Sequence, residues 1–353
     1  MEQALTVDMP NQTALRSRIK LREAALANGP ERNQIYQSHP LIKKEARFPT
    51  APIVEAFQVA EQSVVHYESG ICILGNPRSG KSTAIEAIKT QLSRTMPGLI
   101  VFVVDATGHA TSSESNFWTD FLVAFGRSAG SRSTAAKDRG LVVNMIKGTA
   151  QQAGADRILL IIDEAQTWGY QDYVYLRDLS NRMRRWGIAM VTILFGHTEL
   201  LKLREILLSE GKTDLIGRFF NTPYRFRGLN SQVELLEVLS ALDNPEAAEY
   251  PQGSGICYSE FFLPDDWKAG WRLAQEIEPS WMAFSKVAKR SGRQPNDLGM
   301  NWVMNAIKNA ILTKMAIPEE KRPNDYDLWL QAVENSGYEA SLVLAPASPA
   351  AAS

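Results

Sequence analysis

Four short apolar runs, separated by segments with helical periodicity, constrain the fold of this chain most strongly. The runs read ICIL (71–74), LIVFVV (99–104), ILLII (158–162) and IAMVTILF (188–195). A strand that is apolar at every position is buried on both faces, as in a parallel sheet covered by helices. The segments between the runs space their apolar residues as amphipathic helices do. We therefore predict an α/β fold with a parallel sheet flanked by helices.

No strand-like run follows Leu229, and the remaining apolar residues have helical spacing. We expect four parts: a partly helical N-terminal extension, the α/β domain, a small helical domain and a C-terminal extension. Their expected bounds are 1–46, 47–229, 230–316 and 317–353. The last part ends in APASPAAAS, a low-complexity stretch that we expect to be disordered.

Composition narrows the class of protein. The net charge of −1 gives the chain as a whole no electrostatic attraction to nucleic acid. Any surface that binds nucleic acid would therefore have to be a local basic patch. The two cysteines, Cys72 and Cys257, lack the spacing of metal ligands, which favours a reducing compartment without structural zinc. The start of the chain lacks the pattern of a secretory signal, and no apolar run is long enough to cross a bilayer. We expect a cytoplasmic protein without membrane contact.

A glycine-rich segment follows the first apolar run and precedes a helical pattern. Its sequence, GNPRSGKST, fits the phosphate-loop motif G-x-x-x-x-G-K-S/T in the strand-to-helix context that the motif requires. Backbone N–H groups of such a loop surround phosphate oxygens. Lys81 would contact the β- and γ-phosphates of a nucleotide, and the Ser82 hydroxyl would bind Mg²⁺. The expected nucleotide-binding residues of the loop are Gly75, Asn76, Pro77, Arg78, Ser79, Gly80, Lys81, Ser82 and Thr83.

Two acidic residues end the third apolar run, in ILLIIDEAQ. Parallel sheets present their ligands at the carboxyl ends of strands, so Asp163 and Glu164 would lie near the phosphate loop. We expect Asp163 to hold Mg²⁺ together with Ser82, and Glu164 to polarise an attacking water. The predicted chemistry is therefore hydrolysis of a nucleoside triphosphate, with ATP and Mg²⁺ as the cofactors.

Two further residues are candidates for the catalytic machinery. His197 follows the fourth apolar run in LFGHTEL, where it would sense the γ-phosphate; a hydrogen-bonded structural histidine fits the same position. Arg218, in DLIGRFF, precedes a short extended stretch, TPYRFRGL. An arginine there is suited to act as a finger on the nucleotide of a neighbouring subunit, although a surface ion pair is the alternative.

The order of these motifs resembles one group of ATPases. GNPRSGKST, LLIIDEAQ, LRDLSNRMR, FGHTEL and IGRFF, followed by helices, are similar to the AAA+ ATPases of the TniB/TnsC type, which regulate DNA transposition. The resemblance implies a AAA+ domain followed by a helical lid, Lys81, Ser82, Asp163 and Glu164 at the nucleotide, and His197 in the sensor position. It also implies Arg218 as the finger. Arg293 is a weak candidate for a lid sensor, because Asn296 stands where relatives often carry arginine.

The resemblance further implies a ring or helical filament of identical subunits on duplex DNA, linked to a transposase and a target-selecting protein. The segment between the second and third runs would then face the DNA and contact its backbone without reading sequence. The candidate DNA-contacting residues are Thr111, Ser112, Lys137, Arg139 and Lys147.

Three alternatives remain open from the sequence. A related AAA+ group acts on protein partners, for example in secretion. A helicase is suggested by the letters DEAQ, but no second α/β pattern follows residue 230. A scaffold that binds nucleotide without hydrolysis is disfavoured by the intact Glu164.

Overall fold

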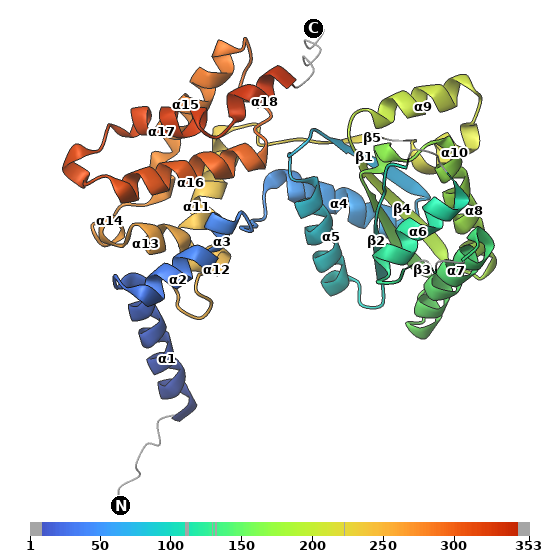
Figure 1. Cartoon of the computed structure of the whole chain (residues 1–353), viewed down its shortest axis with the longest axis horizontal. Coiled ribbons are helices and arrows are strands. Elements are labelled where there is room, and N and C mark those ends of the chain that lie inside the picture. Colours follow the sequence, from blue (N-terminus) through green and yellow to red (C-terminus); the bar gives the residue numbers. More distant parts are fainter. Residues whose placement is uncertain (1–8, 110–112, 129, 131–132, 222, 345–353) are drawn as a thin grey trace, which may run out of the picture. The chain divides into compact units, whose positions relative to one another are not determined.

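Two compact units make up the chain in this computed structural model, which describes residues 9–109, 113–128, 130, 133–221 and 223–344. The sheet unit is formed by Ala51–Arg227, and the helical unit joins Met1–Thr50 to Gly228–Ser353. Figure 1 shows that the helical unit combines the blue start of the chain with its yellow, orange and red end.

A parallel sheet forms the centre of the sheet unit, with five strands in the order β2-β3-β4-β1-β5. The strands are β1 (Gly70–Gly75), β2 (Ile100–Asp105), β3 (Arg157–Asp163), β4 (Ala189–Gly196) and β5 (Pro223–Phe226). The four predicted strands are confirmed, and the extended stretch after Arg218 forms β5. In the register, Asp105 pairs with Asp163 and Leu74 pairs with Gly196, so these carboxyl ends meet at one edge of the sheet.

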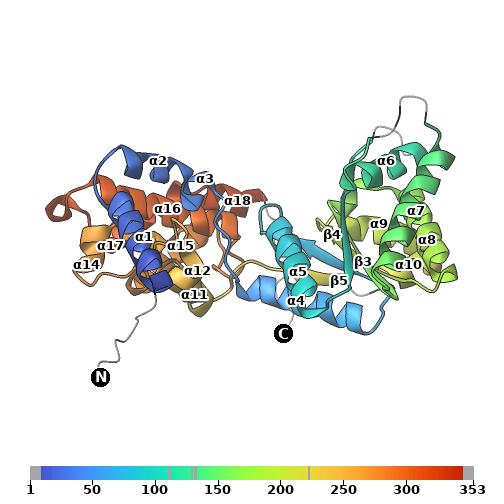
Figure 2. The ribbon, with the colours of Figure 1, turned by 90° about the horizontal axis from the view of Figure 1, so that it is seen from below.

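Helices cover both faces of this sheet, as Figure 2 shows. One face packs against α4 (Ala51–Val65) and α5 (Lys81–Thr95). The other packs against α6 (Glu114–Ala124), α7 (Ala135–Gln152), α8 (Tyr170–Arg185), α9 (Leu200–Ser209) and α10 (Thr213–Phe219). Neighbours along β3 point to opposite faces, so Ile161 joins the first core and Ile162 the second. The predicted α/β architecture with two covered faces is thereby confirmed.

The helical unit has one continuous apolar core. Its α-helices are α1 (Met9–Leu26), α2 (Pro30–Ser38), α3 (Pro40–Lys43), α11 (Gln232–Leu242), α12 (Pro245–Ala248), α13 (Tyr258–Phe262), α14 (Pro264–Lys268), α15 (Ile277–Arg290), α16 (Met300–Ala316), α17 (Asp325–Glu334) and α18 (Tyr338–Leu344). Short 3₁₀ turns lie at Leu273–Glu276 and Glu319–Lys321. Throughout the described ranges, no helix is both long enough and apolar enough to cross a membrane.

The segments that the sequence assigned to N- and C-terminal extensions share this core. Leu41 from the first segment and Trp329 from the last are buried in the same cluster as Leu239 of α11. The unit therefore differs from the expected division into separate parts 1–46, 230–316 and 317–353, because amphipathic spacing identifies apolar faces but does not identify their partners. The tail APASPAAAS lies outside the described residues.

A buried ion pair contacts two tryptophan side chains in the helical unit. Glu276 is 2% exposed and Lys314 is 6% exposed, and their side chains form a salt bridge. The carboxylate of Glu276 also accepts hydrogen bonds from Nε1 of Trp271 at 2.5 Å and of Trp329 at 2.7 Å. These donors satisfy a charge that would otherwise be costly to bury.

Candidate nucleotide site

The phosphate-loop segment forms a tight turn between β1 and α5. Arg78 has φ of 61° and Gly80 has φ of 110°, so the backbone twice enters the left-handed region within this turn. A Cβ atom on Gly75 would lie 3.0 Å from Oγ of Ser79 and 3.1 Å from the carbonyl oxygen of Phe226. Glycine at position 75 therefore allows the close approach that the turn requires, and the turn ends at the first residue of α5, Lys81.

The ammonium group of Lys81 lies inside this turn. Its Nζ donates to the carbonyl oxygens of Gly75 and Asn76, each at 3.1 Å. Burial lowers the pKa of Lys81, whereas the negative charges of Glu164 and Asp163 act in the opposite direction. A buried cation beside an N-terminal helix turn provides the positive potential that a phosphate group requires.

Ser79 offers an independent test of whether the turn fits a nucleotide. Its Oγ is buried and has no hydrogen-bond partner among the described residues. An unpaired buried hydroxyl costs free energy unless a ligand or water supplies the missing partner. The residues of the turn thus fit a bound polyphosphate, with Ser79 and Lys81 as side-chain donors and the backbone N–H groups beside them.

Ser82 and Asp163 bring two oxygen ligands to the carboxyl edge of the sheet. Oγ of Ser82 lies 3.2 Å from Oδ2 of Asp163, and the other carboxylate oxygen accepts from the backbone N of Glu164 at 2.8 Å. Burial raises the pKa of Asp163, and the charges of Glu164 and Asp105 raise it further. A divalent cation would offset that concentration of negative charge. A hydroxyl and a carboxylate suit Mg²⁺, which takes its other ligands from phosphate and water.

The same region contains no dedicated metal cage. Among the residues that the structure describes, no three His, Cys, Asp or Glu side chains gather at a metal-binding distance. Mg²⁺ in nucleotide sites is commonly bound by one or two protein ligands together with phosphates and water, and Ser82 and Asp163 would be such protein ligands.

Glu164 directly follows β3 and has φ of 51°, a left-handed conformation that is uncommon for residues other than glycine. Its Oε2 accepts a hydrogen bond from Nε2 of Gln166 at 2.5 Å. Gln166 belongs to a 3₁₀ turn, η1 (Ala165–Thr167), and the motif that predicted Asp163 and Glu164 assigned it no role. Asp105 was also missed, because only the strand order places the end of β2 beside Asp163.

His197 lies at the same edge, directly after β4. Its backbone N donates to Oε1 of Gln166 at 2.9 Å, and its ring Nδ1 accepts from the backbone N of Glu199 at 3.4 Å. Since β4 lies between β3 and β1, the structure brings His197 to the edge that also holds Asp163 and the phosphate loop.

Arg218 does not join this group within one chain. Its carbonyl oxygen lies 2.7 Å from the position that a Cβ on Gly70 would occupy, at the amino end of β1, whereas the phosphate loop begins at the carboxyl end. Nη1 of Arg218 donates to Oγ of Ser180 at 3.1 Å and to Oδ1 of Asn181 at 3.0 Å, both on α8. Burial lowers the pKa of Arg218, and the positive charges of Arg184 and Arg177 lower it further.

The candidate DNA-contacting residues divide into three groups. Thr111 and Ser112 lie outside the described residues. On α7, Arg139 is bound to Oε1 of Glu114 at 2.8 Å, and Nζ of Lys147 lies 4.5 Å from the ring centre of Trp186. Lys137, near the start of α7, is exposed.

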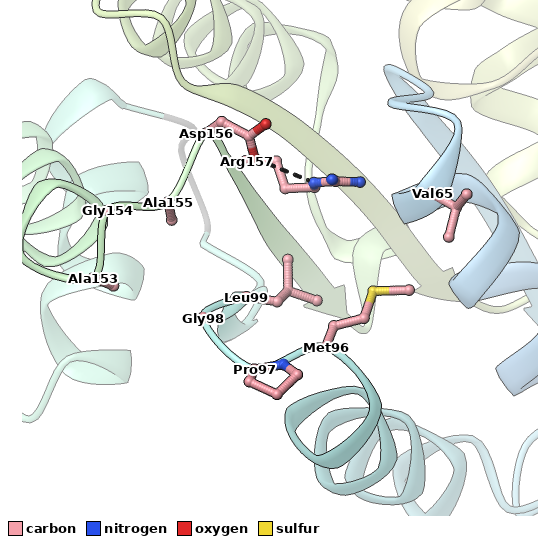
Figure 3. A pocket seen from close by; sticks show the side chains of 10 residues that line it. All are labelled: Val65, Met96, Pro97, Gly98, Leu99, Ala153, Gly154, Ala155, Asp156 and Arg157. Atoms are coloured by element: carbon pink, nitrogen blue, oxygen red, sulfur yellow. Dashed lines mark hydrogen bonds and ion pairs between the residues drawn. The ribbon is translucent and has the colours of Figure 1, made fainter.

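A hollow of about 410 Å³ lies at the opposite edge of the sheet, where β2 and β3 begin. Figure 3 shows Met96 and Leu99 on one side of it, Val65 on another, and the Asp156–Arg157 pair at the start of β3. None of the predicted nucleotide residues lines this hollow, so it is separate from the site at the carboxyl edge.

Comparisons with known proteins agree with this geometry. Residues 65–203, which include β1 to β4 and both acidic residues, match the family model for an AAA domain. This part of the chain is similar to an AAA domain. An AAA domain binds nucleotide, and the enzyme activity of the chain is that of an ATPase. The match ends before Arg218.

Two solved structures of the Aeropyrum pernix ORC2 protein share the fold. The structure with ADPNP-ADP complexes is 12% identical, covers 84% of this chain and 71% of that chain, and has a TM-score of 0.55. The ADP form is 16% identical, covers 81% and 68%, and has a TM-score of 0.52. At these identities the likeness shows the AAA+ P-loop fold alone. The comparison with curated proteins found no match.

Proposed function

We propose that this ATPase is a regulator of DNA transposition of the TniB/TnsC type, which assembles on duplex DNA and connects a target-selecting protein to the transposase. The observation that supports assembly is the distance between the candidate catalytic residues within one chain. Lys81, Asp163 and Glu164 lie at one edge of the sheet, while Arg218 lies at the other end of β1. Two copies side by side would complete the site, because one copy supplies the nucleotide pocket and its neighbour supplies the arginine.

The chain's residues have complementary roles in this proposal. Lys81 and the backbone of the turn would bind the phosphates. Ser82 and Asp163 would hold a Mg²⁺ ion, which would supply positive charge at the phosphates. Glu164 orients a water and accepts its proton at one carboxylate oxygen. Arg218 from the neighbouring copy stabilises charge that develops on the transferred phosphoryl group. Assembly and hydrolysis are therefore coupled, since the complete site exists only between copies.

The DNA part of the proposal is supported by the order of motifs and by the exposed position of Lys137. Lys137 is exposed on α7, where it is available to a phosphate. Arg139 and Lys147 have partners within the chain, and a DNA phosphate would have to compete with these partners. Contacts to the DNA backbone would make binding steeply dependent on salt and nearly independent of sequence.

The first prediction separates nucleotide binding from hydrolysis. Lys81→Ala should abolish both nucleotide binding and ATP-dependent assembly, because it removes the buried cation. Glu164→Gln should keep nucleotide affinity, lower the hydrolysis rate about a hundredfold or more and prolong the assembled state. Nucleotide affinity is measured with a fluorescent ATP analogue, hydrolysis by phosphate release, and assembly by sedimentation velocity.

Lys89→Ala is the matched control, because Lys89 is exposed on the same helix. It should behave as the unmodified protein does. Assembly of Lys81→Ala at the unmodified level would contradict the proposal that nucleotide binding controls assembly.

A further inference from the structure

The side chain of Gln166 joins the ends of two neighbouring strands. Its Nε2 donates to Oε2 of Glu164 at 2.5 Å, and its Oε1 accepts from the backbone N of His197 at 2.9 Å. Glu164 follows β3 and His197 follows β4, which pair along the sheet. A single carboxamide thus connects the carboxylate that would activate water with the backbone of the segment that would sense the γ-phosphate.

The two partners fix the orientation of this carboxamide. A carboxylate accepts hydrogen bonds and a backbone N–H donates one, so Nε2 has to face Glu164 and Oε1 has to face His197. Glutamine is suited to this position because its amide supplies a donor and an acceptor together. Methionine would fill a similar volume without either bond. Glutamate would keep the acceptor for His197 but would place a second negative charge beside Glu164.

The glycine at position 196 leaves space for the side chain of Gln166. A Cβ atom on Gly196 would lie 3.0 Å from Oε1 of Gln166 and 3.2 Å from Cδ2 of Leu200. Gly196 has no positive φ, so space for Gln166 and Leu200 explains a glycine there better than backbone conformation does.

The backbone around Gln166 is held without the help of its side chain. The hydroxyl of Tyr173 donates to the carbonyl oxygen of Ala165 at 2.7 Å, and Oγ1 of Thr167 donates to that of Ala106 at 2.9 Å. Nε1 of Trp168 donates to the buried carboxylate of Asp120 at 3.0 Å. A substitution confined to the side chain at position 166 should therefore leave the path of this segment intact.

We infer that Gln166 is a positioning residue that sets the orientation of Glu164 and makes it depend on the end of β4. Its Nε2 is hydrogen-bonded to one carboxylate oxygen of Glu164, and its Oε1 is hydrogen-bonded to the backbone N of His197. The direction of the second carboxylate oxygen of Glu164 therefore depends on the position of the backbone at His197. If a γ-phosphate displaced the backbone at His197, the side chain of Gln166 would move with it and would change the orientation of the Glu164 carboxylate. This inference rests on the proposed role of Glu164 in hydrolysis.

The test compares Gln166→Met and Gln166→Glu with the unmodified protein in steady-state ATP hydrolysis with Mg²⁺. We expect kcat to fall about tenfold in Gln166→Met, because a hydrogen bond to a charged group is lost, while KM and affinity for a fluorescent ATP analogue change less than about twofold. In Gln166→Glu we also expect kcat to fall, because this substitution replaces the Nε2 donor to Glu164 with a second negative charge. Gln171→Met is the matched control, since Gln171 is exposed on α8 and should change nothing.

Glu164→Gln, measured in parallel, distinguishes the two ways of failing. Unchanged kcat in Gln166→Met together with lost hydrolysis in Glu164→Gln would overturn the role of Gln166 and leave the proposed function standing. Undiminished hydrolysis in Glu164→Gln would instead overturn the proposed role of Glu164. A loss of nucleotide affinity in Gln166→Met equal to its loss of kcat/KM would mean that Gln166 shapes the binding pocket, which also overturns the inference.

Discussion

At the scale of single residues, burial disfavours the charged form of a side chain at two places in the chain. At the carboxyl edge of the sheet it lowers the pKa of Lys81 and raises that of Asp163, so both charged forms gain from a bound phosphate and cation. In the helical unit it holds His39 neutral. That ring is fully buried among aromatic side chains, its Nδ1 accepts from the backbone N of Leu41 at 3.1 Å, and burial lowers its pKa to about 3.

His39 predicts how stability changes with pH. Because its pKa is about 3 in the folded chain and 6.5 when exposed, only the unfolded chain binds the proton between these values. The contribution of His39 to stability is complete above pH 6.5 and is lost as pH falls towards 3, by about 1.4 kcal/mol per pH unit within the window. The substitution His39→Asn removes the titrating ring but keeps an acceptor for the backbone N of Leu41. The free energy of unfolding of this variant, measured by chemical denaturation, should therefore fall less steeply between pH 6 and pH 4 (roughly the middle of the window) than that of the unmodified protein. Parallel curves for the two proteins would contradict this.

The sequence predicted some site residues and missed others for a physical reason. Lys81, Ser82, Asp163 and Glu164 belong to contiguous motifs, and each motif follows an apolar strand, so a parallel sheet brings them to one edge. Gln166 contacts a backbone amide 31 residues away along the chain, and that contact depends on which strand lies next to β3. Apolar spacing predicts strands, but it does not give their order.

At the scale of elements, α8 combines an apolar face with a row of cations. Leu176, Leu179 and Met183 are buried against the sheet, while arginines occupy other positions of the helix. Arg218 of α10 is hydrogen-bonded to this helix. Burial lowers the pKa of Arg218, and the positive charges of Arg184 and Arg177 lower it further, whereas Asp214 and Asp178 act in the opposite direction. A cation in a positive environment gains from an approaching anion, which is the property that a finger directed at a neighbour's nucleotide requires.

The proposed finger role of Arg218 predicts complementation between two inactive variants. Arg218→Ala keeps the phosphate loop and should bind nucleotide normally, but its hydrolysis rate should fall about a thousandfold. Lys81→Ala keeps Arg218 but lacks the pocket. Mixing the two should restore part of the activity measured by phosphate release, because some interfaces then pair an intact pocket with an intact arginine. An activity of Arg218→Ala equal to that of the unmodified chain would show that Arg218 is not a finger.

At the scale of the whole molecule, the sequence predicted the α/β architecture but not the composition of the helical unit. The predicted change after Leu229 lies close to the observed change after Arg227. The N- and C-terminal helices pack into the same core as α11 because Leu41 and Trp329 find their partners far away in the sequence. Packing between segments that are far apart in the sequence depends on the shapes of their side chains and on the total apolar surface that they bury. The local spacing of apolar residues gives neither quantity.

The proposed coupling of nucleotide, DNA and assembly is tested most directly by electron microscopy and sedimentation velocity of the unmodified protein with ATP and Mg²⁺, with and without duplex DNA. We predict small species without DNA and rings or filaments with it, unaffected by the DNA sequence and dispersed by added salt. Assembly with ATP alone, equal with and without DNA, would favour the protein-only alternative. ATP-loaded protein that ignores duplex DNA at low salt would contradict the proposed function.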